Sequence, residues 1–491
     1  MNQRADSPEP RAGIYQCGTL TYTKPALAVL FFWLLWGDFC YVLMESVVPS
    51  IIPLRFKALG ATNTTMGVVL STLPWLISLV LNPVISFRSD RCRSRWGRRI
   101  PFILFSLPFL VGCLIALGFG EQIGLWVNHQ WNGWLGGMSP QSTAIAVISV
   151  ILVAFTVFNT FVNSVFWYLF NDVVPEHLLA RFMSWFRVVS TISASLYNLL
   201  IFRFADTHAT EILVGTGLLY FVGFGLMCLN VKEGKYPQVP NFIDNRPGFV
   251  SAVKTYFSEC LSLPHYWYQF LATFFSAMAF SAVMFMVFFY QSTGLGVAEI
   301  GQINGWINIE VSVLILGSGW LADRFHPIRV CLLGQVLLVF AAIPASMIWM
   351  VWHPVPRTAF WVWMLISLVL TAPTTALLGV WDPPLFMRLF PRDRYGQFCS
   401  ANSIWRAAGI IIGGVFTGMF LDHMKHFASP ADVYRFIPIW QFVCQLPVLI
   451  LLIKLYQSWK RYGGDVSYKP PLPYMSLDPA GGESVTNRVR N

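Results

Sequence analysis

The sequence has 491 residues, of which 56% are hydrophobic, 16% aromatic and 11% charged, and its formal net charge is +10. A soluble domain carries about 25% charged residues, so this composition excludes an ordinary soluble enzyme or binding module. The basic residues are scattered between apolar segments and form no soluble basic face, which excludes a nucleic-acid-binding domain. The positive charge instead indicates membrane topology and contact with anionic lipid.

Apolar segments recur along the whole chain. One crossing of a bilayer takes about 20 mostly apolar residues, and the sequence predicts twelve crossings. We expect them at 26–50, 66–86, 101–120, 142–169, 182–204, 211–230, 264–291, 298–320, 329–352, 358–386, 399–421 and 436–456. The first 24 residues are polar, so we expect no secretory signal before the first span.

The distribution of Lys and Arg predicts the orientation of these spans. If both termini are cytoplasmic, 25 of the 33 Lys and Arg fall in cytoplasmic segments and 6 in outer loops, while Arg187 and Arg406 lie within spans. This asymmetry agrees with the positive-inside rule. We therefore expect a multi-pass protein of the cell membrane, the inner membrane in a bacterium, with both termini in the cytoplasm.

A polar segment divides the spans into two groups of six. The expected regions are a cytoplasmic tail at 1–24, a helical bundle at 25–230, a cytoplasmic loop at 231–263, a second bundle at 264–456 and a cytoplasmic tail at 457–491. This organisation predicts that the second group of six spans repeats the first. If so, short motifs should recur at equivalent places in the two groups.

Two pairs of motifs recur between the groups. Ser89-Asp90-Arg91 returns as Ala322-Asp323-Arg324, at an offset of 233 residues. Pro175-Glu176, followed by Arg181-Phe182, returns as Pro391-Arg392, followed by Gln397-Phe398, at an offset of 216 residues. An all-α membrane protein built from two parallel six-helix repeats is typical of major facilitator transporters, whose substrate site lies between the repeats near the membrane midplane.

The most specific motif follows the span 66–86. It reads Ser89-Asp90-Arg91-Cys92-Arg93-Ser94-Arg95-Trp96-Gly97-Arg98-Arg99-Ile100-Pro101-Phe102. Six Arg between Arg88 and Arg99 hold the turn at the cytoplasmic face, and Asp90 is placed to pair with an Arg or a helix end. A cluster that only sets topology is the alternative. However, the order Ser-Asp-Arg-Cys, then Gly-Arg-Arg-x-Pro-Phe, resembles the same loop of plant sucrose–proton symporters and of glycoside–pentoside–hexuronide:cation symporters.

This resemblance implies a major facilitator fold, transport activity and a sugar-like substrate. In the plant carriers the fourth helix bears an acid and an arginine tied to proton and sugar binding. Alignment through Asn159 and Asp172 puts Thr156 and Trp167 at those positions. The sodium-coupled melibiose-type relatives use acids in the second and fourth helices, whereas 66–86 and 142–169 contain neither Asp nor Glu. The relatives' coupling positions are therefore not carried over to this chain.

Charged residues at the cytoplasmic ends of the spans are expected to gate transport. Asp90 and Asp323 hold equivalent places in the two repeats, and we expect each to act in gating instead of binding. The full set of expected gating residues is Asp90, Arg91, Arg98, Arg99, Glu176, Arg181, Asp323 and Arg324. Asp172 lies at a helix end, where we expect it to be hydrated and to take part in loop contacts.

Carboxylates within spans are the candidates for proton coupling, because an ionisable group at mid-span costs about 2.5–3.5 kcal/mol on insertion scales. Asp38 and Glu45 are seven residues apart, so they share one helical face about 10 Å apart along the axis. Asp38 is the deepest and is expected both to couple protons and to contact substrate, and Glu310 is the third coupling candidate. A structural ion pair or hydrogen bond is the alternative for Asp38.

Amide and aromatic side chains at helical spacing are the candidates for a sugar site. Asn159, Asn163 and Trp167 follow at i, i+4 and i+8, so they share one face. Amides hydrogen-bond to hydroxyls, and an indole stacks on the apolar face of a sugar ring. Asn304 and Asn308 repeat the spacing. The alternative for these amides is a bond to a neighbouring helix, worth about 0.6 kcal/mol in a membrane.

Arginines within the spans are further candidates for substrate contact. Arg187 shares a stripe with Thr191, Ser195 and Asn198, and its planar fork suits hydroxyls or a carboxylate. The alternative is a side chain that reaches back to the cytoplasmic interface. Arg406 is the second candidate. Thr residues around Pro373 predict a broken helix within 358–386.

Together these features predict a secondary transporter that carries a sugar or glycoside by alternating access, coupled to H+. An uncoupled facilitator, and a permease for peptidoglycan fragments or another small polar solute, are the alternatives within transport. A non-transporting membrane sensor is the alternative from another class. We expect no enzyme, because no nucleophile–base set occurs at the membrane edge. We also expect no cofactor, no metal site, since the nine Cys lack metal-ligand spacing, and a monomer in the bilayer.

Overall fold

The structure is a computed structural model that describes residues 14–17, 19–131, 137–234, 260–353, 355–382, 384–391 and 394–471. Most of the expected tails and central loop lie outside these described residues. Twelve helices in the described part are long and apolar enough to cross a membrane, which confirms the predicted number. They are Lys24–Ala58, Asn63–Ser86, Ile100–Gly118, Pro140–Val173, Arg181–Phe204, Ala209–Asn230, Pro264–Ser292, Val297–Phe325, Pro327–Val351, Ala359–Leu378, Tyr395–Met424 and Asp432–Arg461.

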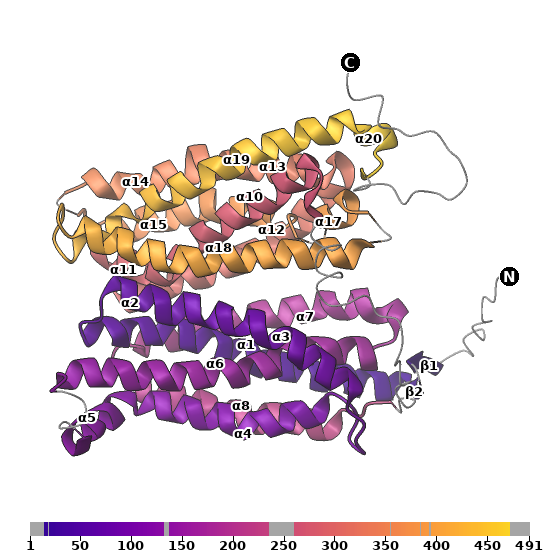
Figure 1. Ribbon diagram of the computed structural model, residues 1–491, viewed down its shortest axis with the longest axis horizontal. Helices are drawn as coiled ribbons and strands as arrows, with labels where there is room; N and C mark the ends of the chain where they lie inside the picture. The colour runs from indigo at the N-terminus through magenta and orange to yellow at the C-terminus, as the bar shows by residue number, and fades with distance from the viewer. Residues whose placement is uncertain are drawn as a thin grey trace.

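The first six spans form the N-terminal group of helices, drawn from indigo to magenta in Figure 1. A hairpin of β1 (Ile14–Cys17) and β2 (Leu20–Thr23) precedes it. Its helices are α1 (Lys24–Ala58), α2 (Asn63–Gly67), η1 (Val68–Thr72), α3 (Leu73–Arg91), α4 (Ile100–Gly118), α5 (Gly120–Trp131), α6 (Pro140–Val173), α7 (Glu176–Leu196), η2 (Tyr197–Ile201), η3 (Phe202–Phe204) and α8 (Ala209–Asn230). The sequence did not predict α5, which is not a span and packs against α6.

The other six spans form the C-terminal group, which lies beside the first group as a second layer in Figure 1. Its helices are α10 (Pro264–Phe280), η4 (Ser281–Phe285), α11 (Met286–Ser292), α12 (Val297–Phe325), α13 (Pro327–Leu337), η5 (Leu338–Ala342), α14 (Ile343–Val351), α15 (Ala359–Ile366), η6 (Ser367–Thr371), α16 (Ala372–Leu378), α17 (Pro384–Leu389), α18 (Tyr395–Met424), η8 (Asp432–Phe436), α19 (Ile437–Arg461) and α20 (Gly464–Ser467).

Three of the four π-helical turns inside the described spans have a local cause; η2 has no proline after it. The π-helical turns η1, η5 and η6 each end two residues before a proline, namely Pro74, Pro344 and Pro373. Proline lacks an N–H and its ring collides with the preceding turn, and a wider turn accommodates both effects. After η6 the helix continues as α16, where Thr375 donates a hydrogen bond to the Thr371 carbonyl at 2.7 Å. The predicted break at Pro373 is thus a wide turn.

The predicted span 358–386 is too long at its second end. The helix stops at Leu378, and α17 begins separately at Pro384. The two consecutive prolines of the segment 382–384 explain the interruption, since the residue before a proline is biased away from helical backbone.

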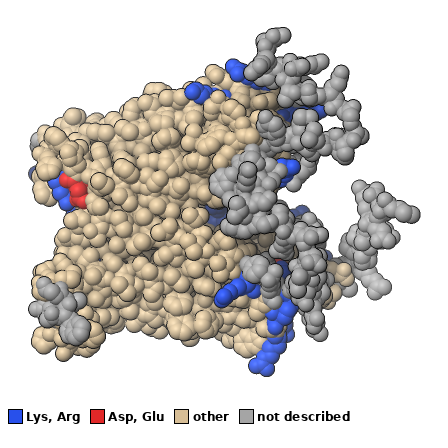
Figure 2. All heavy atoms as spheres, viewed as in Figure 1, with Lys and Arg blue, Asp and Glu red and all other residues tan. Residues whose placement is uncertain are grey.

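The two ends of the helical bundle carry different elements. We call the end that carries β1, β2 and α20 the termini end, and the end that carries α2 and η8 the far end (Figure 1). In Figure 2 blue Lys and Arg side chains gather at the termini end.

The two groups of helices hold each other at the far end. The Asp422 carboxylate accepts hydrogen bonds from the backbone N–H of Asn63, at 3.2 Å, and of Thr64, at 2.8 Å, and from the Thr64 hydroxyl at 2.7 Å. A Cβ at Gly67 would meet the Gly414 carbonyl oxygen at 2.0 Å, so only glycine permits this approach of α2 to α18. Nearer the middle, Ser312 donates to Thr191 at 2.8 Å.

Candidate functional site

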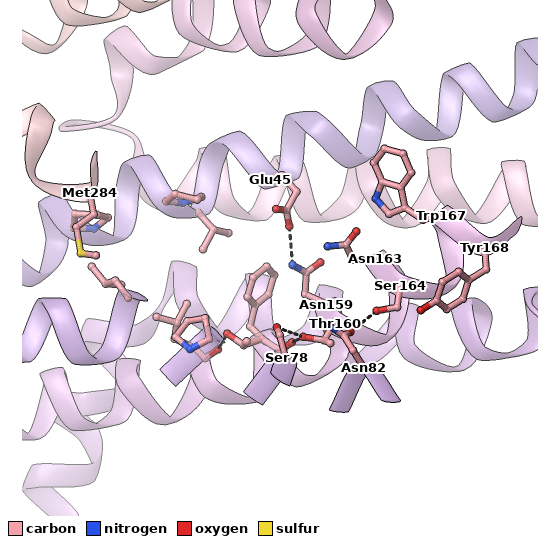
Figure 3. Close-up of a pocket in the computed structure, with 18 residues that line it drawn as sticks. Glu45, Ser78, Asn82, Asn159, Thr160, Asn163, Ser164, Trp167, Tyr168 and Met284 are labelled. Atoms are coloured by element: carbon pink, nitrogen blue, oxygen red, sulfur yellow. Dashed lines mark hydrogen bonds between the residues drawn. The ribbon is translucent and has the colours of Figure 1, made fainter. Parts of the chain in front are cut away.

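A cavity of about 550 Å³ lies in the N-terminal group, between α1, α3 and α6 (Figure 3). Its polar lining consists of Glu45, Ser78, Asn82, Thr156, Asn159, Thr160, Asn163, Ser164 and Tyr168. Met284 of the C-terminal group also lines it, so the cavity reaches the boundary between the two groups. Polar side chains are costly inside a membrane, and their concentration here marks a candidate functional site.

The side chains of Glu45 and Asn159 meet in this cavity. Asn159 Nδ2 donates to Glu45 Oε1 at 2.6 Å, which joins α6 to α1. Tyr41, one turn earlier on α1, also hydrogen-bonds to Glu45. Asn159 Oδ1 is buried and has no hydrogen-bond partner among the described residues. A buried amide oxygen without a partner is an acceptor that a ligand hydroxyl can satisfy.

The helical spacing of α6 places its candidates on one wall. Asn159, Asn163 and Trp167 all line the cavity, as expected from their i, i+4 and i+8 positions. In Figure 3 the three side chains follow one another along the same stretch of helix. Trp167 is 44% exposed, so its indole has a free surface.

The adjoining wall comes from α3 and was not predicted from the sequence. Ser164 donates to Asn82 Oδ1 at 2.6 Å, and Ser78 lies 3.3 Å from Thr160. Asn82 is a polar residue within the predicted span 66–86, so the signal was present. The missing information was which helix faces α6.

Asp38 lies deeper in the N-terminal group and does not line this cavity. Its side chain is fully buried, and its Oδ2 accepts a hydrogen bond from Ser190 of α7 at 2.7 Å. The charge of Arg187, three residues before Ser190, acts on it. Asp38 Oδ1 is buried without a hydrogen-bond partner among the described residues. Tyr41 stands between the two carboxylates of α1, with Asp38 three residues before it and Glu45 four residues after it.

The remaining in-span candidates of the sequence analysis lie apart from the cavity. Arg187 is exposed on α7, and Asn304, Asn308 and Glu310 are partly buried on α12. None of these four lines the cavity of the N-terminal group. Glu310 Oε2 is buried and has no partner among the described residues.

Arg406 has a partner that the sequence analysis overlooked. Its Nη2 donates to Asp382 Oδ1 at 2.7 Å. Asp382 lies inside the predicted span 358–386, so that prediction already placed an acidic residue within a span. The pair lies in the C-terminal group.

The loop between α3 and α4 is tied to the end of α6. Asp172 accepts hydrogen bonds from Arg98, with Nε at 2.8 Å, and from Arg99, with Nε at 3.0 Å. The Asp172 side chain is only 8% exposed, so the expectation of a hydrated residue is wrong. Two guanidinium groups exclude water from it. The expected loop contacts are present.

Glu233, three residues after the end of α8, binds the same loop between α3 and α4. Its carboxylate accepts from the backbone N–H groups of Arg98, Arg99 and Ile100, at 2.9, 2.8 and 2.7 Å. These N–H groups begin α4 and lack partners within the helix, so the carboxylate caps it. Burial raises the pKa of Glu233 above its ordinary value. The three N–H donors favour the charged form and lower this pKa, but their effect is the smaller one.

The other expected gating residues are less fully described. The side chains of Asp90, Arg91 and Glu176 lie outside the described part, so their gating role stays a prediction. Arg181 is exposed at the start of its span. Asp323 pairs with Arg388 at 2.9 Å, and Arg324 lies 5.3 Å from the centre of the Trp320 ring.

Known proteins resemble parts or all of this chain. Residues 34–414 match the Major Facilitator Superfamily. The human Membrane-associated transporter protein is 33% identical over 81 residues, which cover 16% of this chain. Sucrose transport protein SUT1 of Oryza sativa subsp. japonica is 35% identical over 77 residues, or 14% of this chain. Each match spans only 14% of the relative's own length.

Solved structures of transporters share the fold over nearly the whole chain. A bacterial homologue of the human lysosomal transporter Spinster has a TM-score of 0.64 at 14% identity, covering 92% of this chain and 100% of that one. A mutant of the nucleoside transporter NupG has a TM-score of 0.62 at 12% identity, covering 87% and 100%. The xylose transporter XylE from E. coli has a TM-score of 0.53 at 10% identity, covering 86% and 94%. At these identities the likeness shows the fold alone. With twelve apolar helices, this fold and a family match over residues 34–414, the chain is an integral multi-pass membrane transporter that belongs to the Major Facilitator Superfamily.

Proposed function

We propose that this transporter carries a sugar or glycoside by alternating access and couples its movement to protons. One observation carries the proposal: Asn159, Asn163 and Trp167 line one wall of a cavity whose other polar groups are hydroxyls, an amide and a carboxylate. Hydroxyl-rich solutes need many hydrogen-bonding groups, and their rings have apolar faces that an indole covers. A purely apolar solute would leave these polar groups without partners.

The size of the cavity is in keeping with this substrate class. Its volume of about 550 Å³ falls within the usual range of about 300–1,000 Å³ for small-molecule sites. The partial likeness to a rice sucrose transport protein, over 14% of this chain, points in the same direction.

The contacts at the far end support alternating access. The basic side chains gather at the termini end in Figure 2, so by the positive-inside rule we assign that end to the cytoplasm. The bonds of Asp422 to Asn63 and Thr64 then close the outer end of the path between the two groups of helices. Transport requires that these bonds break in the opposite conformation.

Proton coupling is assigned to the carboxylates of α1. Asp38 is fully buried, with one oxygen on Ser190 and the other without a described partner. Glu45 lies at the cavity and bonds to Asn159, a proposed sugar contact. Through Tyr41 the protonation of one carboxylate can influence the other, and through Asn159 it can influence substrate binding.

Reconstitution into proteoliposomes tests the proposal. Uptake of labelled glucose, xylose, sucrose and maltose is measured with and without an inward proton gradient. Asn163→Ala and Trp167→Ala should each reduce sugar uptake about tenfold or more. Asn230→Ala is the matched control, because Asn230 is exposed and its bond within the described part of the chain is to its own helix, at the Leu226 carbonyl.

Each alternative function has its own outcome. Sugar uptake without any response to the gradient indicates an uncoupled facilitator. Lack of uptake of every sugar, by protein that is folded and monodisperse, overturns the sugar proposal and leaves peptidoglycan fragments or a sensor role. Full uptake by Asn163→Ala and Trp167→Ala removes the cavity from the substrate path.

A further inference from the structure

A second polar cavity, of about 340 Å³, lies at the C-terminal group. It is bordered by α10, α13, α18 and α19, and by the turn that follows α16. One side chain of the N-terminal group, Trp75 of α3, also lines it. The residue before it, Pro74, lines the first cavity. The two cavities therefore adjoin the same turn of α3.

A charged pair borders this second cavity. Asp382 and Arg406 both line it, and their side chains are 40% and 38% exposed. An ion pair that is this open contributes little to stability. A guanidinium has five N–H donors, so one carboxylate does not exhaust its hydrogen-bonding capacity. Asp382 lies four residues beyond Leu378, the last residue of its span, and Arg406 lies within α18, so the pair borders the cavity with both charges available to a ligand.

Amide side chains extend the polar lining. Gln335 Nε2 donates to Gln445 Oε1 at 2.9 Å and to the Gln445 carbonyl at 3.0 Å. Gln335 is 1% exposed, so its position is fixed by the packing around it. It therefore holds Gln445 at the edge of the cavity.

A further polar chain lies behind this lining. Thr273 Oγ1 donates to Asn402 Oδ1 at 2.8 Å and accepts from Gln269 Nε2 at 3.1 Å. Gln269 Oε1 is buried and lacks a partner among the described residues. Polar groups in this number are not needed to pack an apolar bundle, and they favour a polar occupant of the cavity.

We propose that the second cavity binds the second ring of a two-ring solute, a disaccharide or a glycoside with a cyclic aglycone, whose first ring occupies the first cavity. This inference rests on the proposed function. The indoles of Trp75 and Trp381 supply surfaces for the apolar face of a ring. Gln445 and the Asp382–Arg406 pair supply donors and acceptors for its hydroxyls. A solute that contacts both groups of helices also favours the conformation in which they approach.

Equilibrium binding to the purified transporter in detergent tests the second subsite. Calorimetric titrations use glucose and xylose as one-ring probes and sucrose and maltose as two-ring probes. Wild type should bind at least one two-ring sugar more tightly than either one-ring sugar. The double variant Asp382→Asn/Arg406→Gln removes both charges together and should weaken that two-ring sugar about tenfold or more, as expected for hydrogen bonds to charged groups. The affinity for glucose should stay within about twofold.

Further variants guard against misfolding as an explanation. Gln445→Leu shortens the polar lining without touching the ion pair and should act in the same direction. Arg329→Gln is the matched control, because it also removes an Arg–Asp ion pair. Arg329 pairs with Asp465 at the termini end, and neither residue lines either cavity. It should leave the affinity for every probe unchanged.

The outcomes separate this inference from the proposed function. If no sugar binds to folded wild-type protein, the proposed function fails. Suppose that sugars bind, and that the double variant and Gln445→Leu lower the affinity for one-ring and two-ring probes equally, or for neither. The second subsite is then overturned, and the proposed function stands. Equal affinity of wild type for one-ring and two-ring sugars also overturns it.

Discussion

Asp172 and Arg388 lie 216 residues apart, at equivalent places in the two repeats, and take opposite parts in two related ion pairs. Asp172, at the end of α6, pairs with Arg98 and Arg99 of the loop before α4. Arg388, in α17, pairs with Asp323 near the end of α12. The position that holds an acid in the first repeat thus holds a base in the second, and the partners differ too, because Asp323 corresponds to Asp90 and not to Arg98 or Arg99. The two pairs also differ in burial: the side chain of Asp172 is 8% exposed and that of Asp323 is 80% exposed.

This difference in burial predicts a difference in stability. Asp172→Asn leaves the buried Arg99 guanidinium short of a carboxylate and should cost about 3 kcal/mol or more, as for other broken buried pairs. Asp323→Asn removes an exposed pair and should cost less than about 1 kcal/mol. The apparent melting temperature of each purified variant in detergent measures the effect. Equal losses for both variants would contradict the idea that the N-terminal pair is structural and the C-terminal pair is not.

The contacts of Asp422 predict a shift of conformation. Asp422→Ala removes three hydrogen bonds between the two groups of helices and should favour the state that is open at the far end, about tenfold or more. The measurement is the rate at which an impermeant maleimide added from the far side reacts with a cysteine at Ser78, in a background without reactive native cysteines. Asp432→Asn is the control, because Asp432 bonds to Ser429 and Arg435 within its own group. An unchanged rate for Asp422→Ala would show that the other contacts at this end, such as the bond from the Tyr434 hydroxyl to Asn63 and the close approach at Gly67, keep it closed.

The orientation of the chain can be checked with the same chemistry. Cys92 should react with an impermeant maleimide only from the cytoplasmic side. Cysteines introduced at Gln130, exposed on α5, and at Lys425 should react only from outside. These positions follow from the distribution of basic residues along the chain. Reaction of Cys92 and the cysteine at position 130 from one side would refute the assigned orientation.

The number of spans was predictable because each one is specified locally, by about 20 apolar residues. Deviations arose where local chemistry interrupts a helix. Proline at Pro373 produces a wide turn and not a break, and the helix ends at Leu378 before the prolines at 383 and 384. The short helix α5 was missed because a segment of this length is stabilised by its packing against α6, which no local pattern reveals.

The candidate site was predictable where a single helix defines it. Asn159, Asn163 and Trp167 line one cavity because their spacing alone puts them on one face. Contacts between helices were not predictable. Asn82 faces Ser164, and Asp382 faces Arg406, only because of how the helices pack. Similarly, a charge at a helix end such as Asp172 is hydrated or paired depending on which loop folds over it.

The last prediction concerns coupling through Asp38. Among the described in-span carboxylates that we nominated, Asp38 is the one that is fully buried and bonded to a neighbouring helix, through Ser190 of α7. Asp38→Asn keeps a hydrogen-bond acceptor for Ser190 but cannot take up or release a proton. This variant should therefore lose accumulation driven by a proton gradient while it retains downhill exchange of substrate. Both are measured in proteoliposomes with the sugar that wild type transports.

Glu45→Ala distinguishes coupling from binding in the same assay. Because the Glu45 carboxylate accepts the hydrogen bond of Asn159 in the cavity, this substitution removes that acceptor and should weaken substrate binding, and so reduce exchange as well as accumulation. Asp38→Asn should reduce accumulation alone. If Asp38→Asn still concentrates substrate as well as wild type, the coupling site lies elsewhere, and Glu310, with a buried oxygen that lacks a described partner, is the next residue to substitute.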